Sequence, residues 1–421
     1  MNFLSIFSSL LILSTFLNST NLKIASYNVE NLFDMHRDGT EYPQYIPNKH
    51  NWTTAILDKK LTNISEVICE IDADIIGLQE VENLNVLKLL QTSLRKFGCS
   101  YRYSAITHKP KSAIQVALLS KIPIESSTDL VVTRSLGIRN ILETKFIVKN
   151  RPLYIFVNHW NSKRSPESRR IISAIALKKR LLSLKEEYIL LGDFNSNYNE
   201  YRSIKKTGIN HTLVTIKDQK LLRKLDLIRE SFQHYNLWLE KPIYKRWSYN
   251  FYGKKEGLDA ILVPYEMFDG RGVDYINNSF DIFKPNYLFA KKGYILRWKY
   301  KRKRHIGIGY SDHLPIVARF STDPYLKSNS DISNGSIVHI FRKQVHFPLL
   351  LKNIKVVSVK KKLVIIEDSS GSITIYGIDT PLEVDKRYDI VVYKRKFYHG
   401  RYEIVDFRVE KRYDSIKKRI Q

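Results

Sequence analysis

The chain of 421 residues has only two cysteines, Cys69 and Cys99. Two thiols are too few for a disulfide framework or for a cysteine-rich zinc site. We expect Cys69 in an amphipathic helix and Cys99 in a loop before a strand, each as a small buried hydrophobic side chain. Any metal ion must then be held by oxygen ligands.

A long apolar run of the kind that spans a membrane is also missing. Residues 1–20 contain no charged side chain, and their apolar core extends from Phe3 to Phe16. This core is short for a bilayer span but long enough for a signal peptide. We predict a signal peptide at 1–20 and export, to the medium or the periplasm. The segment has no basic residue and no A-x-A site, so an uncleaved anchor or a misassigned start are the alternatives.

Acidic residues are scarce relative to basic ones. The chain has 42 Asp and Glu against 69 Lys and Arg, which gives a net charge of +27. Such an excess predicts a polyanionic partner, with nucleic acid first and an anionic membrane surface second. A lysine-rich, biased composition is the simpler alternative. We predict a monomer without a protein partner.

Several apolar, strand-like runs end in polar residues. Since functional residues collect on loops held by a rigid sheet, these ends predict one shared face. The runs are 22–25, 75–78, 153–157, 188–191 and 258–263, and the first four lead into Asn28, Glu80, His159 with Asn161, and Asp193 with Asn195.

The rest of the pattern indicates two domains. Helices are predicted over 51–71 and 168–184, and a polar stretch after Phe320 predicts a linker. Short strands follow it, at 337–341, 354–359, 363–367, 373–376, 390–393 and 402–409. We therefore predict a first domain at 21–321, a linker at 322–336, a small β-barrel domain at 337–412 and a basic tail at 413–421.

A set of sequence strings resembles the endonuclease/exonuclease/phosphatase family over residues 22–321. The resemblance implies an α/β fold, a two-sheet DNase-like sandwich with four layers, and hydrolysis of phosphate esters. The strings are Tyr27-Asn28-Val29-Glu30-Asn31-Leu32, Leu78-Gln79-Glu80-Val81-Glu82, Gln115-Val116-Ala117-Leu118-Leu119-Ser120, Asn158-His159-Trp160-Asn161, Gly192-Asp193-Phe194-Asn195, Gly257-Leu258-Asp259-Ala260-Ile261 and Tyr310-Ser311-Asp312-His313-Leu314-Pro315.

The resemblance also implies roles for the polar residues. Glu80, Asp312 and Asn28 would hold Mg²⁺, which Mn²⁺ or Ca²⁺ could replace. His313 would activate water as a general base while Asp259 orients it. Asp193 and Asn195 would face the phosphate.

Further residues are assigned to substrate and leaving group. His159 fits the second histidine of DNase-like members, although the acid that pairs with it in some relatives is missing from Gln115-Val116-Ala117. Arg139 and Asn161 are predicted to bind substrate. The run 291–305 is predicted to overhang the site and contact the backbone of a nucleic acid, and it includes Lys301, Arg302, Lys303 and Arg304.

The C-terminal strands resemble an OB-fold barrel, with a generic small β domain as the alternative. Residues 393–399 interleave basic and aromatic side chains, a pattern that suits single-stranded nucleic acid.

These patterns predict a metal-dependent phosphodiesterase. We favour an exported nuclease that hydrolyses DNA, with RNA as a second candidate substrate, and with low sequence specificity. The alternatives are a phospholipase-like enzyme (sphingomyelinase) or phosphoinositide phosphatase of the same family, and a catalytically inactive nucleic-acid-binding protein.

Overall fold

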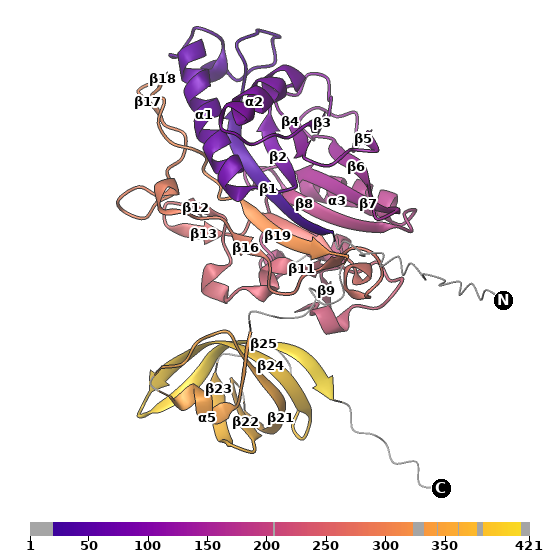
Figure 1. The fold of residues 1–421 in the computed structure, drawn as a ribbon, viewed down its shortest axis with the longest axis vertical. Coiled ribbons are helices and arrows are strands. Elements are labelled where there is room, and N and C mark those ends of the chain that lie inside the picture. Colours follow the sequence, from indigo (N-terminus) through magenta and orange to yellow (C-terminus); the bar gives the residue numbers. More distant parts are fainter. Residues whose placement is uncertain are drawn as a thin grey trace, which may run out of the picture.

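The computed structural model describes residues 20–204, 207–322, 332–342, 344–360, 362–376 and 382–413. An α/β sandwich is followed along the chain by a β-barrel, which lies below the sandwich in Figure 1. The expected signal peptide, apart from Thr20, and the expected tail, apart from Tyr413, lie outside the described residues. Within the described part of the chain, no helix combines the length and apolar character needed to cross a bilayer.

The first sheet of the sandwich has the order β15-β19-β1-β2-β4-β3, and β16 also pairs with β19. Its central strand β1 runs parallel to β2 and antiparallel to β19, so the N-terminal strand is held by the last strand of the domain. The strands are β1 (Asn21–Leu32), β2 (Ile75–Val81), β3 (Tyr103–Ile106), β4 (Gln115–Ser120), β15 (Asp274–Tyr275), β16 (Asp281–Ile282) and β19 (Ile316–Ser321).

The second sheet has the order β11-β14-β8-β7-β6-β5, and β7 and β8 are parallel. Strand β8 is buried along nearly its whole length, as expected for a central strand covered on both faces. The strands are β5 (Ser126–Leu130), β6 (Ile141–Val148), β7 (Arg151–His159), β8 (Glu187–Asp193), β11 (Tyr235–Asn236) and β14 (Asp259–Val263).

Helices complete the predicted four-layer α/β sandwich. α1 (Thr54–Ile71) and α2 (Leu84–Lys96) cover the first sheet, and α3 (Glu167–Leu181) lies on the second, where Arg180 binds Glu143 of β6. Short elements are α4 (Ile209–Thr212), β9 (Ile216–Lys217), β10 (Lys220–Leu221), β12 (Tyr249–Phe251), β13 (Lys254–Glu256), β17 (Tyr300–Lys301), β18 (Arg304–His305) and 3₁₀ turns at Pro43–Tyr45, Glu200–Arg202, Lys224–Asp226, Leu237–Glu240, Ile243–Lys245, Tyr265–Phe268 and Asn286–Leu288.

The two cysteines form a disulfide, which corrects the expectation of two unpaired, buried thiols. Cys69 lies in the last turns of α1 and Cys99 in the loop after α2, with their Cα atoms 5.6 Å apart. The two helices pack side by side, which brings together residues 30 positions apart in the chain. The bond ties this helical layer together.

The C-terminal domain is a barrel closed by five strands. The strand order is β21-β22-β23-β25-β24, and β24 pairs back with β21. Their bounds are β21 (Leu349–Lys360), β22 (Leu363–Asp368), β23 (Gly371–Tyr376), β24 (Arg387–Tyr398) and β25 (Arg401–Tyr413). A separate apolar core fills the barrel, including Leu351, Ile366 and Ile390.

Two expectations for this region need correction. The predicted strand at 337–341 is the helix α5 (Ile337–Phe341), because this apolar run covers the barrel instead of joining it. The expected linker at 322–336 overlaps β20 (Ser333–Gly335), which pairs with β21. The part of that linker at 323–331 lies outside the described residues.

The barrel is attached to the sandwich through buried polar contacts. Arg408 of β25 lies 3.3 Å from the carboxylate of Glu240, and both side chains are buried or nearly so. The backbone N–H of Ile243 donates to Asp406 at 3.2 Å. Loss of either partner of this pair would leave the other charge buried and uncompensated, which is costly.

Candidate active site

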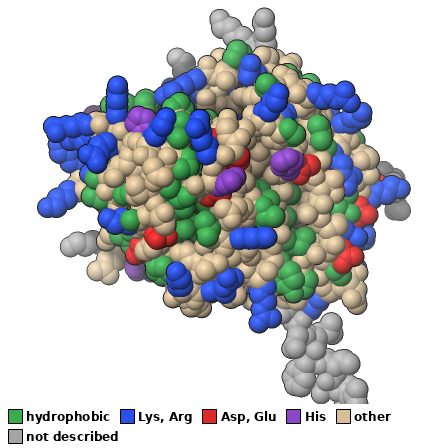
Figure 2. Space-filling model, turned by 90° about the horizontal axis from the view of Figure 1, so that it is seen from above, with side chains coloured by type: hydrophobic (Ala, Val, Ile, Leu, Met, Phe, Trp, Pro, Cys, Tyr) green, Lys and Arg blue, Asp and Glu red, His purple; other side chains and the backbone are tan. Residues whose placement is uncertain are grey.

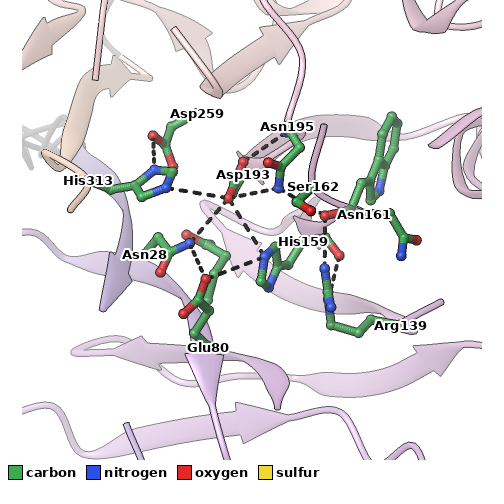
Figure 3. A network of polar contacts seen from close by, with 12 residues as sticks. Asn28, Glu80, Arg139, His159, Asn161, Ser162, Asp193, Asn195, Asp259 and His313 are labelled. Atoms are coloured by element: carbon green, nitrogen blue, oxygen red, sulfur yellow. Dashed lines mark hydrogen bonds and ion pairs between the residues drawn. The ribbon is translucent and has the colours of Figure 1, made fainter. Parts of the chain in front are cut away.

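Asp193 lies at the centre of a polar network at one end of the sandwich (Figure 3). It ends β8, and its carboxylate accepts from the Asn195 backbone N–H at 2.8 Å and from the Asn195 amide at 3.1 Å. The amide of Asn28, from the other sheet, donates to it at 3.2 Å. Burial raises the pKa of Asp193, although the nearby His313 opposes this effect.

A glycine allows β8 to approach β7 at this point. Gly192 has a φ of +132°, and a Cβ atom there would lie 2.0 Å from the backbone oxygen of Asn158. The register then pairs His159 with Asp193 across the two parallel strands, and Asp259 of β14 with Asp193 on the other side. Strands β7 and β8 therefore end, and β14 begins, at the same polar cluster.

Glu80 is aimed into the cluster by an irregularity in β2. The pairing register shifts between Gln79 and Val81, and Glu80 has a positive φ of 68°. Such bulges re-aim a side chain at a cost in backbone strain. The Glu80 carboxylate accepts from the Asn28 amide at 3.0 Å. Burial and the carboxylate of Asp312 raise its pKa, while Asn28 and His313 lower it.

His313 and Asp259 form a buried hydrogen-bonded pair. His313 Nδ1 donates to Asp259 Oδ2 at 2.8 Å, and the hydroxyl of Ser248 donates to the same oxygen at 2.5 Å. His313 Nε2 faces Asp193 Oδ2 at 3.9 Å. Burial lowers the pKa of His313, but Asp259 and Asp193 outweigh it and raise the pKa well above its ordinary value.

His159 lies on the opposite side of Asp193 from His313 (Figure 3). Its Nε2 atom is 3.7 Å from Asp193 Oδ2 and 3.8 Å from Glu80 Oε1. Burial, together with Arg139 and His313, holds the pKa of His159 well below its usual range. Its Nδ1 atom is buried without a hydrogen-bond partner among the described residues, so the acid that the sequence lacks is also missing from the structure.

Asp312 lies at the edge of the network, next to a basic loop. Its Oδ2 atom is 3.4 Å from Arg297, which also binds the buried Glu30. The preceding residue, Ser311, donates to the backbone oxygen of Asn28 at 2.6 Å and fixes this turn against β1. Glu30 accepts in addition from the backbone N–H of Trp298 at 2.9 Å.

Arg139 and Asn161 hold the backbone behind the histidine. The guanidinium of Arg139 donates to the backbone oxygens of His159 at 2.9 Å and Trp160 at 2.8 Å. The amide of Asn161 donates to the backbone oxygen of Gly137 at 2.7 Å. These contacts show that both residues position the backbone beside His159. Their contacts with substrate stay a prediction.

The basic residues Lys301, Arg302, Lys303 and Arg304 form an exposed hairpin of β17 and β18. No hydrogen bond or ion pair among the described residues joins them to the Asp193 cluster. The hairpin is anchored instead to the loop before α1, through the backbone pairing of His305 with His50 at 2.9 Å. Arg297, nearer the start of the same run, is the cation that enters the site.

The face that contains the site is predominantly basic at its rim. Figure 2 views the molecule from above, at the end opposite the barrel, and shows histidine and carboxylate side chains near the centre with Lys and Arg around them. An acidic centre within a basic rim suits a metal ion bound together with an anionic substrate.

The donor set fits a hard divalent cation. Glu80 and Asp312 supply carboxylate oxygens, and burial together with the Asp312 carboxylate raises the pKa of Glu80, so a cation would stabilise its charged form. The Oδ1 atom of Asn28 accepts from the backbone N–H of Glu30, so the metal contact of Asn28 stays a prediction. Asp193, Asp259 and His313 also offer atoms within 4.8 Å of one another. In this second group, His313 and Asp259 already share a hydrogen bond, which a metal ion bound to the same atoms would replace.

Comparison with known proteins agrees with this site. The family model described as "Endonuclease/Exonuclease/phosphatase family" matches residues 23–321. The chain belongs to the endonuclease/exonuclease/phosphatase family, whose enzymes hydrolyse phosphate ester bonds with divalent metal ions. A search of curated proteins gives no match.

Several solved structures have a similar fold but low sequence identity to this chain. Humanized D. rerio TDP2 is 15% identical, with a TM-score of 0.47, over 71% of this chain and 98% of that one. D. rerio TDP2 complexed with single strand DNA product is 14% identical, with a TM-score of 0.46, over 72% and 99%. A family protein from Bacteroides thetaiotaomicron is 14% identical, with a TM-score of 0.43, over 72% and 99%.

Sequence reasoning missed two residues that shape the site. Ser248 supports Asp259, and Arg297 binds Glu30 and contacts Asp312. Serine before an aromatic residue carries little signal, and Arg297 was one of many cations in a basic run. Only the fold distinguishes them from their neighbours.

Proposed function

We propose that the protein is an exported, metal-dependent nuclease that hydrolyses DNA, with RNA as a second candidate substrate, and with low sequence specificity. The observation that carries the proposal is the His313–Asp259 pair facing Asp193, with Glu80 on the same carboxylate network. This arrangement places a proton acceptor beside hard oxygen ligands, as phosphodiester hydrolysis requires.

Each residue then has a defined task. Asp259 holds the Nδ1 proton of His313, which directs Nε2 toward the attacking water. Asn195 and His159 contact phosphate oxygens from the other side of Asp193. Glu80, Asp312 and Asn28 would hold Mg²⁺, whose positive charge stabilises the anionic transition state and lowers the proton affinity of His313.

Charge supports a nucleic acid as the substrate. The net charge is +27, and the rim of the site is lined by Lys and Arg. Backbone phosphates supply the complementary charge without base-specific contacts, so binding should weaken steeply with salt.

The barrel is assigned a supporting role in binding. Its strand order, with β24 closing on β21 and β23 parallel to β25, is similar to that of an OB-fold. The β24–β25 hairpin exposes Phe397 and Tyr398 next to Lys396. Stacking on these rings together with backbone neutralisation would hold a single strand.

Export is supported by two independent features of the chain. The first twenty residues are uncharged with an apolar core, and Cys69 is bonded to Cys99. Disulfides persist mainly in oxidising compartments. Determination of the N-terminal residue of the mature protein tests this assignment directly.

The activity is tested with supercoiled plasmid. We expect Mg²⁺-dependent nicking that EDTA abolishes and that is lost in His313→Ala. The matched control is His108→Ala, since His108 is an exposed histidine outside the site. Intact plasmid at ample Mg²⁺ and Mn²⁺, with plasmid still bound, would favour the inactive nucleic-acid-binding alternative.

A second candidate is hydrolysis of a phospholipid headgroup, which one observation favours. The β12–β13 hairpin exposes 44% of Phe251 and 90% of Tyr252. Tyr249, on the same hairpin, has its ring centre 4.9 Å from that of His313. An aromatic hairpin tip beside the site could enter a membrane surface.

Assays of headgroup release from sphingomyelin and phosphoinositide vesicles distinguish this candidate function from the nuclease activity. If the hairpin serves lipid, Phe251→Ser with Tyr252→Ser should abolish headgroup release and leave plasmid nicking unchanged. Tyr376→Ser, an exposed tyrosine on the barrel, is the control.

A further inference from the structure

A second group of carboxylates lies outside the network around Asp193. Asp38, Glu41 and Glu82 each offer an oxygen, and these atoms lie within 4.8 Å of one another. Two oxygens bound to one Ca²⁺ ion are at most about 5 Å apart, since each Ca–O distance is about 2.4 Å. The spacing therefore fits a shared calcium ion.

The surroundings of Glu82 indicate that the cluster binds a cation. Only 3% of the residue is exposed, and its Oε1 atom is buried without a hydrogen-bond partner among the described residues. Its other oxygen, Oε2, accepts from the backbone N–H of Asp34 at 2.7 Å. A buried carboxylate oxygen without a donor is costly, and a bound cation would satisfy it.

Hydrogen bonds within the loop 38–41 position the carboxylates of the cluster, but they do not neutralise its negative charge. Glu41 accepts from the backbone N–H groups of Asp38 and Gly39, and one oxygen of Asp38 accepts from Thr40. Asp34, Asp38 and Glu41 lie beside Glu82, and all of them are carboxylates. None of the ion pairs found among the described residues includes any of these four acids.

This absence of counter-charge is unusual for so basic a chain. With 69 Lys and Arg against 42 Asp and Glu, an acid group of this size would be expected to attract a basic side chain. Asp34 itself is fully engaged, because it accepts from His36 and from the amides of Asn83 and Asn85. It holds the loop against the end of β2 and leaves the other three carboxylates facing one another.

We propose that Asp38, Glu41 and Glu82 form a Ca²⁺ site that is separate from the proposed catalytic metal site. Ca²⁺ takes six to eight oxygen ligands in flexible geometry, so water and loop carbonyls complete the shell, whereas Mg²⁺ demands a tighter octahedron. The ion fixes the loop that carries Tyr42, a residue close enough to Glu80 and Arg139 for both to influence its pKa. Calcium would thereby order one wall of the active site without entering the reaction.

The test is calorimetric titration of CaCl₂ into the full chain in excess Mg²⁺. We expect a single Ca²⁺ ion per chain, unaffected by Glu80→Gln and lost in the double variant Asp38→Asn with Glu41→Gln. Glu82→Gln should weaken it at least tenfold, and Glu186→Gln, an exposed acid elsewhere, should leave it unchanged. Circular dichroism checks that each variant is folded.

Thermal unfolding gives an independent readout. Ca²⁺ should raise the Tm of the native chain and of Glu80→Gln but not that of the double variant. Calcium binding that survives in the folded double variant, or that disappears in Glu80→Gln, would overturn the proposal. So would a native chain that binds no Ca²⁺.

Discussion

Arg297 Nε lies 3.0 Å from Glu30 Oε1, and this bond joins the basic loop to the strand end that carries Asn28. The same guanidinium lies 3.4 Å from Asp312 Oδ2. A fixed positive charge therefore occupies the edge of the proposed metal site. It limits how strongly the carboxylates attract a further cation.

Arg297→Gln is predicted to tighten Mg²⁺ binding. Removal of a half-exposed charge near Asp312 should lower the half-activating Mg²⁺ concentration about fivefold, which corresponds to about 1 kcal/mol. The measurement is nicking rate against Mg²⁺ concentration. Lys301→Gln, in the exposed hairpin, is the control, and weaker Mg²⁺ activation in Arg297→Gln would contradict the prediction.

Asp259→Asn is predicted to reduce kcat about a thousandfold, because the amide no longer selects the tautomer of His313 or stabilises its charge. Ser248→Ala removes only one donor to Asp259 and should cost about tenfold. Both variants should bind plasmid with unchanged affinity in a filter assay. Equal losses in the two variants would show that the pair does not act as assigned.

Much of this site was predictable, because its residues lie at the ends of apolar runs that became strands: Glu80, His159 and Asp193 lie where a strand ends, and Asp259 where one begins. The run before Asp193 and the run that starts at Asp259 became neighbouring antiparallel strands, and the register placed the two acids opposite each other. What local sequence cannot specify is contact between distant elements. The Cys69–Cys99 bond depends on how α1 packs on α2, and the apolar run 337–341 is equally consistent with a strand or a helix.

The basic run shows the same limit. Charge density indicated that residues 291–305 face a polyanion, but nothing in the spacing distinguishes Arg297 from Arg302. Arg302 and Lys303 occupy a left-handed turn at a hairpin tip, whereas Arg297 faces Glu30. The backbone conformation of the folded chain determines which basic side chain of this run contacts the site.

His234 is predicted to make the fold acid-sensitive. Its Nδ1 donates to the backbone oxygen of Leu213 and its Nε2 accepts from Tyr188, while burial lowers its pKa to about 4. Because the folded pKa lies below the unfolded value of about 6.5, stability is complete above pH ~6.5 and decreases as pH falls toward 4, by about 3 kcal/mol in total. Urea unfolding of the native chain and His234→Gln across this range measures it, and the variant should lose this part of the pH dependence.

Arg408→Met is predicted to destabilise the junction between the domains by about 3 kcal/mol, since it leaves Glu240 buried without a cation. Limited proteolysis should cleave the variant faster than the native chain, and thermal unfolding should begin at a lower temperature. Arg412→Gln is the matched control, because its partner Glu383 is half exposed and such a pair contributes at most about 1 kcal/mol.

Loss of the disulfide is predicted to lower the free energy of unfolding by roughly 3–4 kcal/mol. The bond closes a loop of 30 residues, and the cost follows from the freedom this loop gains in the unfolded chain. Denaturant unfolding of Cys69→Ser with Cys99→Ser measures the difference. A stability equal to that of the native chain would mean that the helical layer needs no covalent tie.

The amide of Asn28 reaches from one sheet to the carboxylate of Asp193 on the other, so the polar network spans both sheets of the sandwich. Any change in the core that shifts one sheet against the other by a fraction of an ångström alters this bridge first. Substitutions deep in the interior, far from any reacting atom, should therefore weaken turnover well before they unfold the chain.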